Sequence, residues 1–311
     1  MTIAISGCGG FIGNVLVRHL LDNGYPVRGM DNFDKGHCDA LLGVIDRSNF
    51  EFFEGDVCNP KDCEHLVKDC SGVVNLAALV GFPRCLKRPE LAHLVNVNGV
   101  ANMVAARNNF TNLAPFIQTS TGSVYGAVID DICTEETPCN TNTVYGITKL
   151  KAEEILRKER NVIIYRYATA FGVSPSMRVN LLVNDFVNRA LTDRSLTIFE
   201  ADFKRTFIHI LDFARTIGFA LKNYDKMTDV IYNAGDEKLN WSKRDVAEYI
   251  KGKTGCHITY ADIGKDLDVR NYTVSYKRLN KLGFYCHINM EKGIDELIKA
   301  GRLLRSRNPY D

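Results

Sequence analysis

Short apolar runs alternate with amphipathic segments along the first half of the chain. The runs typical of buried strands lie at residues 2–6, 26–30, 50–53, 73–78, 115–119 and 162–165. Helical periodicity follows at residues 12–23, 60–70, 89–110 and 144–160. Strands that alternate with helices are joined by right-handed crossovers, which give a parallel sheet covered on both faces. The pattern therefore predicts an α/β fold with a doubly wound parallel sheet.

After about residue 170 the alternation becomes less regular. Strand-like pieces at residues 196–199, 230–233 and 257–260 mix with helical pieces at 181–191, 243–253 and 290–300. We interpret this part as a smaller α/β lobe, some segments of which return to the main sheet. The predicted division is residues 1–170 for the sheet domain and 171–311, in the main, for the lobe.

Composition narrows the class of protein. With 311 residues, 45% of them hydrophobic, the chain can bury a full core without a metal or a disulfide framework. The net charge of +2, without a basic block, gives no indication of nucleic-acid binding. Ten cysteines without a Cys-x-x-Cys pair indicate reduced thiols, and no uncharged run approaches the ~20 residues of a membrane span. We expect a soluble, cytoplasmic protein without a metal site.

Glycines 7, 10 and 13 have the spacing G-x-x-G-x-x-G between the first predicted strand and the first predicted helix. Such glycines allow a tight turn and a close approach of backbone to a pyrophosphate, which the helix N-terminus then binds. Asp31, at the end of the second strand, can accept both ribose hydroxyls and would repel a 2′-phosphate. The loop therefore predicts a dinucleotide site that favours NAD over NADP, although an ordinary glycine-rich turn has a similar sequence.

A second set of polar residues has the chemistry of alcohol–ketone interconversion. Tyr145 and Lys149 are four residues apart and share one face of a predicted helix, and hydroxyl side chains fill residues 119–123 except for Gly122. A tyrosine has a pKa of ~10, so it needs nearby positive charge to act as a base near neutral pH. An isolated Tyr-x-x-x-Lys pair is commonplace, but here it accompanies the glycine loop and the hydroxyl strand.

Together these motifs resemble the extended short-chain dehydrogenase/reductase family, in its nucleotide-sugar epimerase/dehydratase branch, which includes UDP-glucose 4-epimerase. The resemblance rests on segments 7–13, 31–32, 55–57, 75–78, 119–126, 145–149, 205–209 and 268–275. It implies a Rossmann-type domain that binds NAD, a C-terminal lobe that binds a nucleoside-diphosphate sugar, and a homodimer. Residues 96–107 and 148–156 would supply the helices of the dimer interface.

The resemblance also implies roles for individual residues. Tyr145 would be the base, Lys149 would lower its pKa and hold the nicotinamide ribose, and Thr121 would bind the reacting sugar hydroxyl. The implied contacts of NAD are Gly7, Gly10, Phe11, Ile12, Gly13, Asp31, Asn32, Asp56, Val57, Leu76, Ala77, Ala78, Thr119, Tyr145, Lys149 and Ala168. The implied contacts of the substrate are Val80, Gly81, Thr121, Ser123, Asn180, Arg205 and Arg270.

Two arginines and an asparagine are implied partners of the substrate diphosphate. Arg205 and Arg270 would each present a guanidinium fork to it, and Asn180 would contact a phosphate. Taken alone, each arginine is more often a surface ion-pair residue. Cys85 could donate a proton to an enolate, but a small apolar contact is the interpretation we favour, and His209 is expected to be structural.

The residues after Thr121 separate the reactions of the family. The 4,6-dehydratases carry an Asp-Glu pair where this chain has Gly122 and Ser123. UDP-glucuronate decarboxylases tend to have a Glu at Ser123, and the GDP-mannose 3,5-epimerase type has a Cys there. These reactions are therefore disfavoured, and we predict a 4-epimerase that acts through a transient 4-keto sugar. A 4-dehydrogenase or 4-ketoreductase would use the same Thr/Tyr/Lys set and stays open, whereas intact Tyr145 and Lys149 argue against a non-catalytic NAD sensor.

Overall fold

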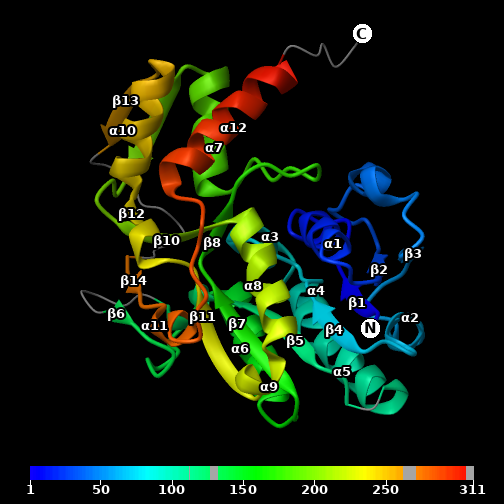
Figure 1. The fold of residues 1–311 in the computed structure, drawn as a ribbon. Helices are drawn as coiled ribbons and strands as arrows, with labels where there is room; N and C mark the ends of the chain where they lie inside the picture. Colours follow the sequence, from blue (N-terminus) through cyan, green and yellow to red (C-terminus); the bar gives the residue numbers. More distant parts are fainter. Residues whose placement is uncertain (112, 127–131, 262–270, 306–311) are drawn as a thin grey trace.

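The computed structural model describes residues 1–111, 113–126, 132–261 and 271–305, and its core is a seven-stranded parallel sheet (Figure 1). The strand order is β11-β7-β5-β4-β1-β2-β3. The strands are β1 (Ile3–Ser6), β2 (Val27–Asp31), β3 (Phe50–Glu54), β4 (Gly72–Asn75), β5 (Phe116–Thr121), β7 (Val162–Tyr167) and β11 (Val230–Ala234). This confirms the predicted α/β fold of the Rossmann type.

The order of the strands reverses at β1. Successive strands β2 and β3 lie on one side of β1, and β4, β5, β7 and β11 lie on the other. Ser6 is in register with both Met30 and Asn75, so β1, β2 and β4 reach their carboxyl ends together. In open α/β sheets ligands bind outside the carboxyl ends of the strands at such a reversal. The topology therefore points to the loops after β1, β2 and β4.

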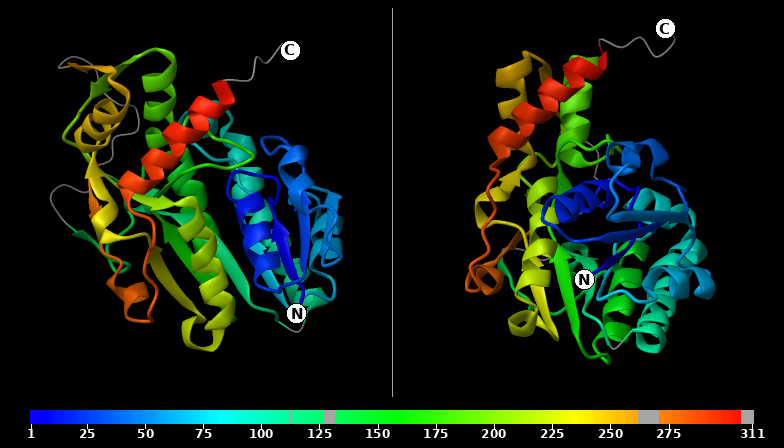
Figure 2. Two further views of the ribbon diagram at one scale, coloured as in Figure 1. Left: turned by 45° about the horizontal axis from the view of Figure 1, so that its top comes forward. Right: turned by 45° about the vertical axis from the view of Figure 1, so that its right-hand side comes forward.

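Helices cover both faces of the sheet (Figure 2). On one face α1 (Gly13–Asp22) packs beside α8 (Ile210–Lys222), and on the other α5 (Gly99–Phe110) packs between α2 (Pro60–Val67) and α6 (Val144–Leu156). Each layer encloses its own core of buried apolar side chains, with Leu16 and Ile217 in the first and Met103 and Leu156 in the second. The sequence analysis does not predict α8.

The predicted helix at residues 89–110 is not regular. It begins as α4 (Pro89–His93), widens into a π-helical turn at Leu94–Asn98 and continues as α5. A π turn inserts an extra residue and is frequent near functional sites. Here it turns the side chain of Asn96 into the interior, where 1% of it is exposed.

The C-terminal lobe has a separate apolar core. A small sheet of β8 (Thr169–Phe171), β10 (Lys204–His209) and β12 (Asn240–Ser242) packs near a pair formed by β9 (Ser195–Phe199) and β13 (His257–Ala261). Figure 1 shows the helices of the lobe gathered above the main sheet. They are α7 (Leu182–Thr192), α10 (Lys243–Thr254) and α12 (Met290–Arg305). As expected, a later segment returns to the main sheet, where it forms edge strand β11.

Short elements complete the described part of the chain. These are α3 (Phe82–Lys87), α9 (Tyr224–Met227), α11 (Lys277–Asn280), strands β6 (Ile132–Cys133) and β14 (Thr273–Val274), and 3₁₀ turns at Cys38–Val44, Gly122–Tyr125 and Glu237–Leu239. Among the described helices, none has the length and apolar character that a membrane crossing requires.

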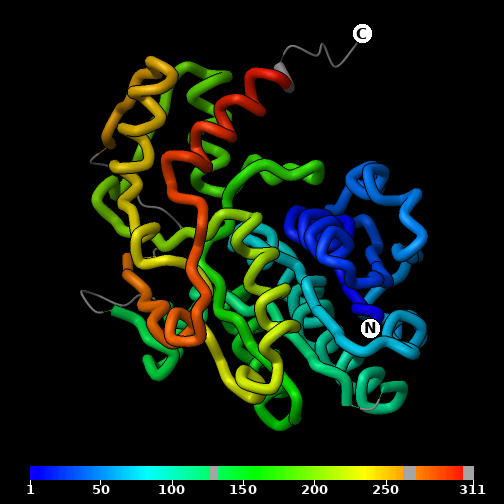
Figure 3. The backbone as a smooth tube through the Cα atoms, viewed as in Figure 1, coloured from blue at the N-terminus to red at the C-terminus, as the bar shows by residue number. Residues whose placement is uncertain are grey.

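One long connection joins the two parts of the molecule. The segment between β8 and α7 extends from the C-terminal lobe towards α1 and is visible in green in Figure 3. Ser174 in this segment donates a hydrogen bond to the carbonyl oxygen of Phe11 (2.9 Å) and accepts one from Asn14 Nδ2 (3.0 Å). The segment is therefore attached to the glycine-rich loop.

Candidate active site

The glycine-rich loop between β1 and α1 has room for backbone only. Gly7 has φ +76°, and a Cβ there would lie 2.9 Å from the amide nitrogen of Ala77. A Cβ at Gly13 would overlap the carbonyl oxygen of Gly7. No side chain caps the start of α1, and the amide of Asn14 donates to the carbonyl oxygen of Gly10 at 3.2 Å. The loop thus has the shape and the donors that a pyrophosphate needs.

Asp31 lies at the carboxyl end of β2, beside this loop. Its Oδ2 accepts a hydrogen bond from Gly9 N and its Oδ1 from Phe33 N, both at 2.8 Å. Burial raises the pKa of Asp31, and these backbone donors oppose the rise. Asn32 Nδ2 donates to Asp56 Oδ2 at 2.8 Å and joins the loops after β2 and β3. The acidic group predicted to bind the ribose therefore lies beside the glycine-rich loop.

Other predicted cofactor contacts lie around the same strand ends. Leu76 N donates to Ser6 O at 3.1 Å and Ala77 N to Ser6 Oγ at 3.4 Å, which sets the loop after β4 against the loop after β1. Ile12 and Ala78 are half-buried, whereas Phe11 is buried. Val57 is also buried and packs against Gly99 of α5, and Ala168 donates its amide to Ala234 O at 2.9 Å.

The hydroxyl strand β5 brings Thr121 to the same edge of the sheet. Thr121 Oγ1 accepts from Ser123 N and donates to Ser123 Oγ, each at 3.1 Å, and the threonine is half-buried. Thr119 Oγ1 donates to Asn75 O at 3.0 Å and links β5 to β4. A Cβ at Gly122 would lie 3.3 Å from the hydroxyl of Tyr272, so a larger side chain there would press on that ring.

Helix α6 carries Tyr145 and Lys149 and packs directly on β5 and on the turn Gly122–Tyr125. Thr143 caps this helix by accepting a hydrogen bond from Gly146 N at 3.0 Å. Tyr145 is half-buried and Lys149 is 3% exposed. Burial lowers the pKa of Lys149 from 10.5 to about 8, while the negative charge of Glu153 acts in the opposite direction. The three predicted catalytic residues therefore lie on neighbouring elements.

Asn96 in the π turn connects two parts of the site. Its Oδ1 accepts from Leu79 N at 2.7 Å, and its Nδ2 donates to Thr148 Oγ1 at 3.0 Å. Thr148 Oγ1 in turn donates to the carbonyl oxygen of Tyr145 at 3.0 Å. The loop after β4 and the first turn of α6 are thus held in register by one buried amide. The sequence analysis does not identify Asn96, because the periodicity at 89–110 predicts a regular helix.

A buried ion pair supports α6 from behind. Glu153 is completely buried, accepts from Ser120 Oγ at 2.5 Å and pairs with Arg166 Nη2 at 2.7 Å. Arg166 also donates to the hydroxyl of Tyr125 at 3.3 Å, and that hydroxyl donates to Asn233 Oδ1 at 2.6 Å. This network joins β5, β7, β11 and α6 next to the predicted catalytic residues.

The predicted substrate residues have different environments. Arg205, on β10, is almost completely buried, whereas Asn180 is exposed just before α7. Val80 and Gly81 precede α3 and are half-buried. Arg270 lies outside the described residues.

Cys85 is completely buried in α3. Its Sγ donates to Leu79 O at 3.3 Å, and burial raises its pKa to about 11. A thiol in this state packs as a small apolar side chain, in line with the interpretation we favoured. His209 is also completely buried; its Nδ1 accepts from Leu211 N at 3.3 Å and caps α8.

Arg178 lies beside the candidate site, although no motif indicated it. It lies on the segment between β8 and α7, and its Nη2 is 3.9 Å from the point where a Cβ at Gly81 would stand. Its charge interacts with Tyr145 and with Arg84. The sequence gives only a weak signal for Arg178, because a single arginine in an irregular segment is usual on a protein surface.

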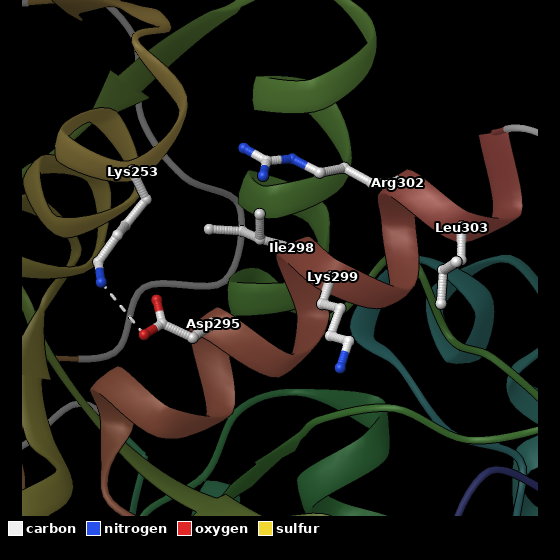
Figure 4. A pocket seen from close by; sticks show the side chains of 6 residues that line it. All are labelled: Lys253, Asp295, Ile298, Lys299, Arg302 and Leu303. Atoms are coloured by element: carbon white, nitrogen blue, oxygen red, sulfur yellow. Dashed lines mark hydrogen bonds and ion pairs between the residues drawn. The ribbon is translucent and has the colours of Figure 1, made fainter.

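A separate hollow on the C-terminal lobe contains none of the predicted site residues. It lies between α10 and α12 and is lined by Lys253, Asp295, Ile298, Lys299, Arg302 and Leu303 (Figure 4). Lys253 Nζ and Asp295 Oδ2 form an ion pair at 3.2 Å across it. Its charged groups are exposed, as expected for a solvated surface.

Comparisons with known proteins identify the family of the chain. A family model described as "NAD dependent epimerase/dehydratase family" matches residues 3–235. UDP-glucose 4-epimerase 2 of Arabidopsis thaliana is 28% identical, over 99% of this chain and 96% of its own. The low-salt glycan biosynthesis protein Agl12 of Haloferax volcanii is 27% identical, over 96% of this chain and 97% of its own. The solved structure of UDP-glucose 4-epimerase from Thermotoga maritima with UDP-glucose has a TM-score of 0.86 at 23% identity, covering 98% of this chain and 100% of that one.

The family match includes the glycine-rich loop, Asp31, the hydroxyl strand and α6. It therefore confirms the resemblance stated from the motifs, and with it NAD as the cofactor. The chain belongs to the NAD dependent epimerase/dehydratase family.

Proposed function

We propose that this protein is an NAD-dependent epimerase that inverts C4 of a nucleoside-diphosphate sugar through a transient 4-keto intermediate. The observation that carries the proposal is the complete Thr121, Tyr145 and Lys149 set next to positions 122 and 123 that lack an acidic pair. A Cβ at Gly122 would lie 3.3 Å from the hydroxyl of Tyr272, so an aspartate at this position would require a small shift of that ring. The name of the Arabidopsis thaliana relative, UDP-glucose 4-epimerase 2, also supports sugar-nucleotide chemistry.

The chain's own residues would handle the proton at O4. Tyr145, as phenolate, accepts the proton of the C4 hydroxyl, and Thr121 donates a hydrogen bond to the same oxygen. Bound NAD supplies the acceptor, and afterwards the donor, of the hydride at C4. Tyr145 then returns its proton to O4 after the 4-keto sugar has turned its other face, so no proton or electron is gained overall. Positive charge on Lys149 favours the phenolate form of Tyr145.

The cofactor and the substrate would occupy neighbouring parts of the site. The amides of the glycine-rich loop would hold the pyrophosphate of NAD, Asp31 its adenosine ribose, and Lys149 its nicotinamide ribose. The lobe formed after residue 170 would bind the nucleotide sugar, with Arg205, Arg270 and Asn180 at its diphosphate. Two guanidinium groups on one diphosphate give bidentate, charge-assisted bonds that fix position as well as affinity.

We also propose that the protein is a cytoplasmic homodimer. Leu94 and Ile147 are 42% and 38% exposed, and they lie just before the segments 96–107 and 148–156 that the family resemblance assigns to the interface. All ten cysteines are free thiols, as in a reducing compartment.

The test is to incubate the purified protein with a panel of nucleoside-diphosphate sugars, while NMR follows the sugars and absorbance follows reduced nicotinamide. A new C4 epimer without accumulating NADH is the expected result. A steady rise of NADH with a 4-keto product would instead identify a 4-dehydrogenase.

A further inference from the structure

The segment between β8 and α7 holds Arg178 in a defined position. Asn184 Nδ2 on α7 donates to the carbonyl oxygens of Arg178 (3.0 Å) and Gly172 (3.3 Å), and its Oδ1 accepts from Gly172 N (3.1 Å). Ser174 fastens the same segment to Phe11 in the glycine-rich loop. The segment that carries Arg178 is therefore attached to α7 at one end and to the glycine-rich loop at the other.

The side chain of Arg178 lies across from the loop that precedes α3. Its Nη2 is close to Gly81, and the residue is half-buried. Tyr145 and Arg84 are the titratable groups that act on it, and neither carries a carboxylate. Within the part of the chain that the structure describes, the guanidinium forms no hydrogen bond or ion pair.

Arg84 provides a contrast a few residues away. Its guanidinium pairs with the carboxylate of Asp34, so its charge is already compensated. Arg178 has no such carboxylate partner among the described residues; burial lowers its pKa, a Tyr145 phenolate opposes this, and the charge of Arg84 lowers it further. The guanidinium of Arg178 is partly desolvated and lies beside the predicted base. Pairing with an anionic group of the ligand would offset the cost of this desolvation.

We propose that Arg178 binds the carboxylate of a nucleoside-diphosphate uronic acid, and thereby selects this class of sugar over neutral hexoses. The inference rests on the proposed function, in which Tyr145 acts on O4. The substituent of C5, next to C4, is a hydroxymethyl group in a hexose and a carboxylate in a uronic acid. A hydroxymethyl group cannot offset the burial of a guanidinium, whereas a carboxylate can do so through two charge-assisted hydrogen bonds.

The diphosphate is a less suitable partner for this arginine. It lies at C1, on the opposite side of the sugar ring from C4, and the predicted diphosphate residue Arg205 is on β10 of the C-terminal lobe. Arg178 instead interacts with the residue predicted to act at C4. Its position therefore assigns it to the end of the sugar where hexoses and uronic acids differ.

The experiment compares matched pairs of substrates, glucose and glucuronate attached to UDP, dTDP, GDP and CDP. Wild-type holoenzyme, Arg178→Gln, Arg178→Lys and the control Arg189→Gln are assayed for kcat/KM with each pair. Arg189 lies on α7 with only long contacts to Asp185 and Asp193 (3.8 and 4.0 Å), so its replacement removes one positive charge from the neighbouring helix. We expect wild type and the control to prefer the glucuronate member of one pair.

For Arg178→Gln we expect kcat/KM with the glucuronate substrate to fall by about 30- to 100-fold, the scale of a lost charged hydrogen-bond pair. With the glucose substrate the decrease should be several-fold at most, and Arg178→Lys should restore part of the preference. Equal losses with both substrates, or a wild-type preference for glucose, would overturn the inference.

A binding measurement separates this inference from the proposed function. Calorimetric titration of the Tyr145→Phe holoenzyme, with and without Arg178→Gln, gives Kd for both members of each pair without turnover. Tighter binding of glucuronate that Arg178→Gln abolishes supports the carboxylate site even if C4 is not inverted. A pentose product with release of CO₂ would likewise keep Arg178 in its role and replace epimerisation by decarboxylation. Equal Kd values for the two sugars would refute the carboxylate site, whatever reaction is observed.

Discussion

Two successive turns of α6 each bury a charged side chain, and they do so in opposite ways. Glu153 is enclosed by Ser120 and Arg166, which occupy both of its oxygens at 2.5–3.2 Å. Lys149, four residues earlier, is 3% exposed and has no hydrogen bond or ion pair within the described residues. The first charge is neutralised by the protein, whereas the second is available to a ligand.

The difference separates structural charges from functional ones. Lowering the pKa of Lys149 from 10.5 to about 8 corresponds to a cost of about 3 kcal/mol for keeping it charged. Perturbed groups of this kind concentrate at functional sites, because a compensated charge has little left to offer a ligand. Arg166 and Arg178 repeat the same contrast between a fully paired arginine and one that faces the site.

The largest effect is expected on turnover, when Tyr145 in the first turn of α6 is replaced. Tyr145→Phe should reduce turnover by roughly 10²–10⁴-fold, the usual contribution of a general acid–base group, because no phenol remains at O4. The free energy of unfolding should stay within about 0.5 kcal/mol of wild type, as for most substitutions away from the core. Steady-state kinetics and urea unfolding check the two expectations, with the exposed Tyr285→Phe as control. Near-full turnover would remove Tyr145 from its assigned role.

Replacing Glu153, the charge paired within the protein, should lower stability most. Glu153→Gln leaves the buried guanidinium of Arg166 without a counter-charge, and we expect the free energy of unfolding to fall by about 3–5 kcal/mol. Glu154→Gln, on the exposed side of the same helix, should change it by less than about 0.5 kcal/mol. Urea denaturation of both variants measures the difference. Equal free energies of unfolding would show that the ion pair does not stabilise the fold.

Lys149→Met should stabilise the NAD-free fold while it abolishes activity. The folded pKa of about 8 lies below the unfolded value of 10.5, so the burial cost is complete below pH 8 and declines as pH rises towards 10.5. We expect a gain of up to about 3 kcal/mol at pH 7 that shrinks across this window. Thermal unfolding between pH 7 and 10 measures it, with the exposed Lys151→Met as control. A loss of stability at pH 7 would contradict the contrast with Glu153.

Asp31 has a structural role and a predicted role in binding NAD. Its replacement should have the smallest effect of these substitutions. Its carboxylate fixes the amides of Gly9 and Phe33 and is also the predicted partner of the NAD ribose. Asp31→Ala should weaken NAD binding by about 10- to 100-fold, the scale of a hydrogen bond to a charged group. Calorimetric titration of the NAD-free protein tests this, and the near-isosteric Asp31→Asn separates charge from shape. Unchanged affinity in both variants would place the ribose elsewhere.

Much of the fold and the chemistry could be predicted from the sequence because the signals are local. Apolar runs mark the strands of a sheet that is buried on both faces, and the glycine spacing at 7–13 and the pair Tyr145 and Lys149 are short motifs. The edge position of β11 cannot be predicted from a local signal, because its partner β7 comes more than 60 residues earlier.

The rest depends on contacts between distant segments. Asn96 has meaning only because Leu79 and Thr148 reach it, and the π turn that aims it inward leaves no trace in the periodicity. Arg178 becomes part of the site only when the segment after β8 reaches the glycine-rich loop. Helix α8 has a clear apolar face, but the sheet and the α1 surface that it covers are formed by residues far from it in sequence.

The attachment of Ser174 to Phe11 and Asn14 has a thermodynamic consequence for the whole enzyme. The segment that carries Arg178 and the loop predicted to hold the pyrophosphate share these hydrogen bonds, so order in one favours order in the other. Binding equilibria coupled in this way are reciprocal: a substrate that strengthens cofactor binding must itself bind more tightly when the cofactor is present. The proposed epimerase would reuse one NAD in every cycle, and it would gain from this coupling because the cofactor would be held most firmly while its hydride is needed.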